Sequence, residues 1–318
     1  MRFEIIPSES KQSYTLKDNT SGTTAEILTF GAVLNQFTIP VAGNSFNVID
    51  AFKDTTEATQ EITNGFHGAK LSPFVCRLHQ GEYSFEGNSY KIDKHYMGAS
   101  AIHGLVYDAP FTVSATHVDE HKATLSLLYS YKNPSQGFPF HYDLEVIYKL
   151  SVGSVLQVTT HVTNVGRGNM PLNDGWHPYF TVGETINTAA IRFDSKELVA
   201  FDEALLPTGK SSPYNNFNEF NIFAETELDN CFTLNRDSYE QGQPPAFQIK
   251  NEQTGLSLSI FPDSSYPYLQ IYTPPSRKCI AVENLSSLPD SFNNKTGLII
   301  LGAGESRTFS TAYVLSIA

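Results

Sequence analysis

The sequence contains few cysteines and few charged side chains. Three cysteines, Cys76, Cys231 and Cys279, occur among 318 residues, and no two have Cys-x-x-Cys spacing. An odd number of cysteines without close pairs predicts neither a disulfide framework nor a zinc knuckle. Only 17% of the residues are charged, which is low for a helical protein, because the outer faces of helices need Glu and Lys.

Long apolar segments are also missing. No stretch reaches the length of a membrane span, and residues 1–7 lack the apolar run of a signal peptide. The formal net charge is −12, which disfavours binding to nucleic acid and to anionic membranes because both are negatively charged. The sequence therefore predicts a reduced, soluble, cytoplasmic protein with neither of these partners.

Several catalytic motifs are absent from the sequence. It has no GxSxG elbow, no Walker loop, no GxGxxG loop and no HExxH helix. His103, His177 and Glu283 have the residue types of a two-histidine, one-carboxylate iron site, but such sites usually draw two ligands from one short segment. We therefore expect no metal and no cofactor.

The patterns that are present indicate β-structure. Hydrophobic residues make up 40% and aromatic residues 12%, enough for a large core, and apolar and polar residues alternate at the two-residue period of strands. A hairpin is expected over 83–92, and a surface loop over 207–224, which is rich in Ser, Asn and Pro. Further strands are expected over 123–131, 142–150, 155–165, 247–250, 256–261, 268–273, 280–283, 298–301 and 308–316. Many short strands separated by Gly, Asn and Pro turns predict an all-β fold, a large antiparallel β-sandwich, in one domain spanning 1–318.

One block combines side chains suited to sugars. Residues 173–180 read Asn-Asp-Gly-Trp-His-Pro-Tyr-Phe and hold the only tryptophan of the chain. Gly175 and Pro178 bracket Trp176 and His177, so we expect strand pairing to break and a bend to present both side chains. An aromatic ring suits the apolar face of a sugar, and a neighbouring histidine can transfer a proton. The alternative is a corner of the sandwich in which these rings only fill the core.

Four more polar residues are candidates for a site. Arg77 lies in an apolar run, where it needs a carboxylate or a ligand, a structural salt bridge being the alternative. His103 precedes Gly104, which lets another group approach closely, although a lone histidine there is also typical of a core. Glu283 ends an apolar strand, so we expect it at the rim of a sheet, where partial burial would raise its pKa and make it a candidate base. Asp229 suits a sugar hydroxyl, but it is equally typical of a turn.

Taken together, these segments resemble the aldose 1-epimerase (galactose mutarotase) family, from about residue 25 to the C-terminus. The resemblance depends on their order along the chain. The matching segments are Phe30-Gly31-Ala32-Val33-Leu34, the Arg77 segment followed by Gly81 and the 83–90 hairpin, His103-Gly104, His177-Pro178-Tyr179-Phe180, Leu228-Asp229-Asn230-Cys231-Phe232, and Val282-Glu283-Asn284 with Pro289-Asp290 beyond it.

The resemblance implies an antiparallel β-sandwich that interconverts the α and β anomers of a free sugar without a cofactor. It implies that Glu283 is the general base on the anomeric hydroxyl, that His177 is the acid that protonates the ring oxygen, and that His103 binds near that oxygen. Arg77 and Asp229 resemble contacts to sugar hydroxyls, and we expect Trp176 to form a wall of the site. Since ring opening removes one proton and delivers another, we expect an ionised Glu283 beside a protonated His177.

The chain departs from the best-known members of that family, and this leaves the sugar open. It carries Val75-Cys76-Arg77 where they have Asn-Arg after a glycine, and Leu105 where they often have a second glycine. A related branch acts on hexose 6-phosphates, and Arg277-Lys278 could serve a phosphate. With 21 Lys and Arg against 33 Asp and Glu, we place unphosphorylated sugars first. The sequence is also compatible with a catalytically silent sugar-binding protein and with a different carbohydrate enzyme, and we expect a monomer or a homodimer.

Overall fold

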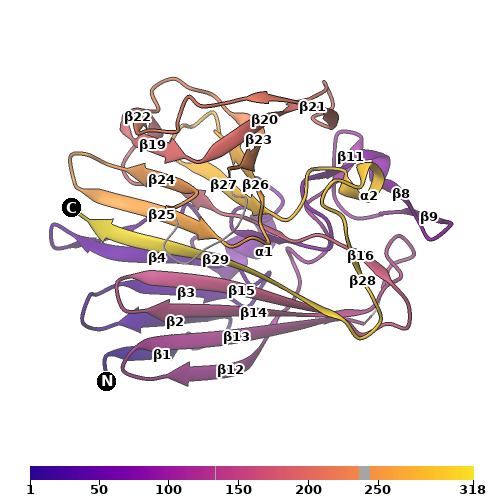
Figure 1. Ribbon diagram of the computed structural model, residues 1–318. Helices are drawn as coiled ribbons and strands as arrows, with labels where there is room; N and C mark the ends of the chain where they lie inside the picture. Colours follow the sequence, from indigo (N-terminus) through magenta and orange to yellow (C-terminus); the bar gives the residue numbers. More distant parts are fainter. Residues whose placement is uncertain (133, 236–243) are drawn as a thin grey trace.

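The computed structural model describes residues 1–132, 134–235 and 244–318, and most of its strands lie in three antiparallel sheets (Figure 1). The large sheet has the order β12 (Thr112–Val118), β13 (Lys122–Tyr131), β14 (Tyr142–Ser151), β15 (Val155–Asn164), β29 (Ser306–Ile317), β25 (Leu256–Pro262), β24 (Phe247–Lys250), β19 (Ala190–Phe193), β22 (Asn221–Ile222). The N-terminal sheet has the order β1 (Phe3–Pro7), β2 (Ser13–Asp18), β3 (Thr24–Leu28), β4 (Leu34–Val41), β5 (Asn44–Asn47).

The third sheet, called the site sheet below, has the order β21 (Pro207–Pro213), β20 (Ser195–Phe201), β23 (Asp229–Leu234), β26 (Tyr268–Tyr272), β27 (Ile280–Leu285), β17 (Gly175–His177), β6 (Ala69–Leu71). The short strand β18 (Tyr179–Phe180) also pairs with β27. Smaller ladders join β10 (Tyr96–Met97), β11 (Ser100–Ile102) and β7 (Arg77–Leu78), β8 (Glu82–Phe85) and β9 (Asn88–Lys91), and β16 (Met170–Leu172) and β28 (Ile299–Leu301). The helices α1 (Thr55–Glu61) and α2 (Ser291–Asn294) are short.

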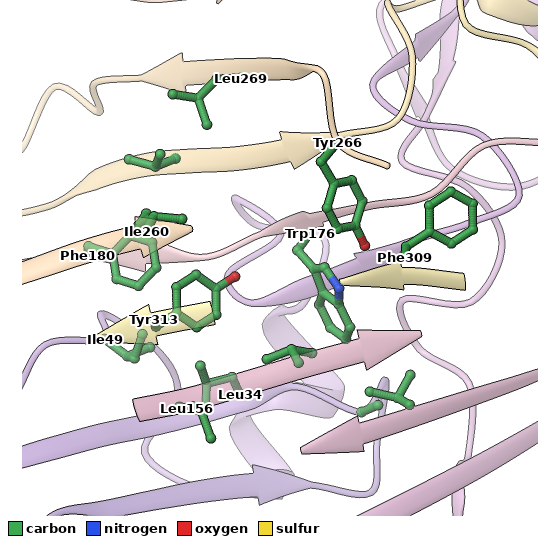
Figure 2. Packing of buried hydrophobic residues seen from close by; sticks show 14 of the residues in the cluster. Leu34, Ile49, Leu156, Trp176, Phe180, Ile260, Tyr266, Leu269, Phe309 and Tyr313 are labelled. Atoms are coloured by element: carbon green, nitrogen blue, oxygen red, sulfur yellow. The ribbon is translucent and has the colours of Figure 1, made fainter. Parts of the chain in front are cut away.

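Alternation in the sequence explains the central strands. Every second residue of β14, from Tyr142 to Leu150, is buried, and the residues between them face outward. β14 pairs with β15 over its whole length, and a turn with Gly153 at φ 85° joins the two strands. The inward side chains meet those of the other sheets in one large apolar cluster, part of which Figure 2 shows between Leu34, Leu156 and Leu269. The predicted all-β sandwich is confirmed.

Two expectations about the backbone are wrong in part. The segment 207–224 is not simply a surface loop, because β21 pairs with β20 and β22 pairs with β19. β21 lies at a sheet edge with polar, exposed side chains, so it shows no apolar alternation to mark it as a strand. Around Trp176 the chain does not bend, since Gly175–His177 forms β17 between β27 and β6, and pairing is interrupted only at Pro178.

The three cysteines do not pair with one another. Cys76, Cys231 and Cys279 are all buried and free. Within the described ranges, no helix has the length and apolarity needed to cross a membrane.

Candidate active site

A pocket of about 370 Å³ opens over one face of the site sheet. Four neighbouring strands, β23, β26, β27 and β17, line it with Asp229, Gln270, Glu283 and His177. Gln270 lies directly opposite Glu283 in the ladder, and Asp229 lies opposite Tyr272. Residues alternate between the two faces of a strand, so the polar side chains face the pocket while their neighbours enter the core.

Glu283 lies in the middle of β27, and it is 2% exposed. The expectation of a position at the sheet rim is wrong, because the strand continues through Asn284 and Leu285, which are also buried. Burial raises the pKa of Glu283 well above its ordinary value, and the negative charge of Asp229 adds to this shift. A carboxyl group in this environment holds a proton more strongly than one in water, as a proton-transfer group requires.

His177 faces Glu283 from the neighbouring strand. Its Nε2 lies 3.3 Å from Oε1 of Glu283, and burial lowers the pKa of the imidazole to about 3. Burial thus favours the neutral forms of both groups, in contrast to the expected pair of an ionised Glu283 and a protonated His177. With one proton held between the two residues, either arrangement contains one acid and one base.

His103 reaches the pocket from the chain that follows β11. It adopts a left-handed backbone conformation at φ 60°, and its backbone N–H donates to the backbone carbonyl oxygen of Cys76 at 2.9 Å. Its ring lies 4.9 Å from that of His177 and 4.6 Å from that of Phe66, between centroids. The predicted close approach at Gly104 is confirmed, because a Cβ atom there would lie 2.3 Å from the carbonyl oxygen of Ser72.

Arg77 and Asp229 lie at the mouth of the pocket with different partners. The Arg77 guanidinium donates to the carbonyl oxygen of Met97 at 3.2 Å, and within the described chain it forms no ion pair with a carboxylate. Gln270 donates from Nε2 to Oδ1 of Asp229 at 2.9 Å. The arginine charge and the Asp229 carboxylate are therefore both positioned where a ligand with several hydroxyl groups can reach them.

Trp176 does not line the pocket, which corrects the prediction that it walls the sugar site. It is 3% exposed and belongs to the core cluster (Figure 2). Its ring packs against that of Tyr148. The reason is the alternation of β17: if His177 faces the pocket, the side chain before it must face the core. Aromatic surface in the pocket comes instead from Phe66, Tyr179 and Tyr272.

Asp174 forms part of a buried polar cluster on the core side of the site sheet. Its carboxylate accepts from the ammonium group of Lys70 and, at 2.6 Å, from the hydroxyl of Tyr266. Lys70 and Asp174 are both fully buried, and the Lys70 ammonium also lies 4.4 Å from the centre of the Trp176 ring. This cluster links β6 and β17 with the chain before β26, and it sets the position of the strand that carries His177.

Arg277 is committed to the protein itself. Its guanidinium donates to the side chain of Asn187 and to the carbonyl oxygens of Ala224 and Thr226, and it does not line the pocket. It therefore holds the chain around 224–226, away from the pocket that Glu283 and His177 line.

Sequence reasoning missed several pocket residues. Cys76, Tyr179, Gln270 and Tyr272 all line the pocket. Gln270 and Tyr272 had a usable signal, since they alternate along β26 with the core residues Leu269 and Ile271. Cys76 had none, because its Sγ comes within 3.9 Å of Oε2 of Glu283 only through contacts between distant segments.

Comparison with known proteins agrees with this fold. The sequence profile described as aldose 1-epimerase matches residues 12–314. The uncharacterized Escherichia coli protein YihR is 28% identical over 253 residues, 77% of this chain and 78% of its own length. A galactose mutarotase-like protein from Clostridium acetobutylicum aligns with a TM-score of 0.86 at 19% identity, over 99% of this chain and 98% of that one. Galactose 1-epimerase from Lactobacillus acidophilus aligns with a TM-score of 0.80 at 17% identity, over 99% and 98%. The chain belongs to the aldose 1-epimerase family.

Proposed function

We propose that this protein is a mutarotase that interconverts the α and β anomers of a free hexose. The observation that carries the proposal is the buried pair of His177 and Glu283, 3.3 Å apart in the lining of a small-molecule pocket. Ring opening of a sugar needs one proton removed and one delivered, and two groups that share one proton provide both functions.

In the proposed reaction, the Glu283 carboxylate takes the proton from the anomeric hydroxyl while His177 donates a proton to the ring oxygen. The bond between C1 and the ring oxygen breaks, and an open-chain aldehyde forms. After rotation about the C1–C2 bond, the ring oxygen attacks the other face of C1, and both protons return. The reaction starts with the proton on His177; burial opposes this arrangement, and hydrogen bonds from sugar hydroxyls to the carboxylate favour it.

His103 and Arg77 complete the proposed site. His103 lies against His177, and burial together with the neighbouring cationic groups lowers its pKa well below the ordinary value. A neutral His103 is suited to hydrogen bonding near the ring oxygen. Arg77, Asp229 and Gln270 provide donors and acceptors for the sugar hydroxyls at the mouth.

The charges of the pocket favour an unphosphorylated sugar. Among the described residues that line it, Arg77 is the only lysine or arginine, while Asp229 and Glu283 bring carboxyl groups. A phosphate dianion would meet these carboxyl groups with a single cation to offset them. Arg277 does not line this pocket, so a hexose 6-phosphate meets no second guanidinium among the described lining residues.

The proposal is tested by following anomer equilibration of freshly dissolved aldoses, free and 6-phosphorylated, by polarimetry. We expect acceleration above the buffer rate, and faster equilibration of free sugars than of their phosphates. Sugar binding in calorimetry without any acceleration would identify a catalytically silent binding protein instead. Preference for the phosphorylated sugars would contradict the argument from pocket charge.

A further inference from the structure

We propose that the pocket is also a binding site for a zinc-like divalent cation, held by Cys76, His103 and Glu283. Each of these residues offers one ligand atom, and the three atoms lie within 4.8 Å of one another. All three side chains are buried, with exposures of 7%, 6% and 2%. The Sγ of Cys76 lies 3.9 Å from Oε2 of Glu283.

The chemistry of these ligands selects the metal. Thiolate, imidazole and carboxylate are the common ligands of Zn²⁺, at distances of about 2.0–2.3 Å in a tetrahedron, which places ligand atoms roughly 3.3–3.8 Å apart. The spacing here is close to that range, so side-chain movements of about an ångström would bring the three ligands to one cation, with the fourth position left for water. On binding, the cation displaces the protons of the Cys76 thiol and the Glu283 carboxyl group to solvent. The resulting thiolate and carboxylate together balance its two positive charges.

The backbone holds two of these ligands close together. Cys76 and His103 are both non-glycine residues in the left-handed region, at φ 49° and 60°, a conformation that costs free energy and is held here by the surrounding structure. The backbone N–H of His103 donates to the backbone carbonyl oxygen of Cys76 at 2.9 Å, and this bond holds the two segments together. Within the described part of the chain, Nδ1 of His103 is buried without a hydrogen-bond partner.

The same ligands serve the proposed reaction, so metal and sugar compete. A cation on Glu283 occupies the carboxylate that would take the anomeric proton, and it lies beside His177, whose Nε2 is 3.3 Å from the other carboxylate oxygen. We therefore infer that zinc inhibits the enzyme reversibly. The inhibition, but not the metal binding, rests on the proposed mutarotase function.

The test is a titration of the purified protein with Co²⁺, whose tetrahedral thiolate complexes show intense visible bands and a near-ultraviolet charge-transfer band. We expect one equivalent to produce both in the unmodified protein. Cys76→Ser should abolish the charge-transfer band, and His103→Asn should weaken binding by at least about 100-fold, more than the loss expected from an outer-shell change. The matched control is Cys279→Ser, which alters a buried cysteine beside Asp50, outside the cluster.

Unchanged cobalt spectra in Cys76→Ser and His103→Asn would overturn the proposal, as would the absence of any thiolate band in the unmodified protein. If Cys76→Ser fails to fold, the spectrum of His103→Asn decides. A parallel mutarotation assay with Zn²⁺ and then EDTA tests the inhibition. Cobalt binding without any mutarotase activity would support the proposed metal site and refute the proposed function. Mutarotase activity without cobalt binding would support the proposed function and refute the metal site.

Discussion

Replacing Asp174 with Asn removes the negative partner of Lys70 beneath the site sheet. Both side chains are fully buried, and the Lys70 ammonium interacts with the Asp174 carboxylate, with the Gly175 carbonyl oxygen at 3.2 Å and with the Trp176 ring. The Asn side chain keeps an acceptor for the hydroxyl of Tyr266. The variant therefore isolates the loss of charge from the loss of volume.

The expected loss of stability is about 3–5 kcal/mol, as for other buried pairs from which one partner is removed. An upper limit comes from the lysine itself, which can give up its proton. Holding a lysine neutral at pH 7 costs about 4–5 kcal/mol, at 1.36 kcal/mol for each of the roughly 3.4 pH units below its ordinary pKa. Lys70→Met should cost a similar amount, because Asp174 must then take up a proton. The double variant should be more stable than the sum of the two losses predicts.

The pH dependence gives a second sign of the same mechanism. In the native protein burial lowers the pKa of Lys70 to about 8, despite the opposing effect of Asp174. Without Asp174 the folded-state pKa falls further, so near pH 7 the folded variant binds fewer protons than the unfolded chain. Stability must then rise with pH, by up to about 1.36 kcal/mol per unit. We expect Asp174→Asn to gain stability relative to the native protein between pH 6.5 and 8.

These differences in unfolding free energy are measured by urea unfolding monitored by fluorescence. The native protein, both single variants and the double variant are compared. A loss of unfolding free energy below about 1 kcal/mol for each single variant would refute the argument. It would mean that the charge left without its partner can reach water in the folded protein. Additive losses in the double variant would show that the two groups do not interact. A pH-independent difference between Asp174→Asn and the native protein would refute the assignment of the proton to Lys70.

Three further substitutions test other parts of the structure. Gly104→Ala should lower stability by about 1–3 kcal/mol and reduce activity by displacing His103. The control Gly43→Ala has the same backbone strain but nothing within 4 Å of the new Cβ, so its effect should be smaller. Equal effects of the two substitutions would refute the close approach at Gly104. Trp176→Phe should cost about 1–3 kcal/mol in urea unfolding without changing KM for the sugar, and a tenfold rise in KM would place Trp176 at the substrate after all. Arg2→Ala should destabilise the protein at pH 6 and much less near pH 2. Arg2 lowers the pKa of Asp18 to about 2, and the stability from this pair is lost as the pH falls through that value and Asp18 takes up a proton; an equal loss of stability at both pH values would contradict it.

The strands of the large sheet were predictable because they are local patterns. β14 and β15 alternate over their full length, and a Gly-containing turn separates them. The fully buried β27 has no alternation, so the polar Glu283 and Asn284 suggest a strand end although the strand continues to Leu285. Where a strand is buried on both faces, the sequence does not show which side chains share a face.

The site was predictable in its residue types but less so in its geometry. Once Gly175–His177 is known to be a strand, alternation alone shows that Trp176 and His177 point to opposite faces of the sheet. The opposition of Gln270 and Glu283 depends on the register between β26 and β27. The approach of Cys76 to Glu283 depends on segments 207 residues apart. Long-range pairing of this kind leaves no local pattern in the sequence.

The most direct test of the proposed mechanism is the rate of anomer exchange, measured by NMR on α-glucose and α-galactose for the native protein and for Glu283→Gln. Glu120→Gln serves as the control, since Glu120 is exposed in the turn between β12 and β13. We expect the native protein and the control to accelerate exchange, and Glu283→Gln to be slower by roughly 10²–10⁴-fold, the contribution of one acid–base group. Equal rates for the native protein and Glu283→Gln would contradict the assignment of Glu283 as the base.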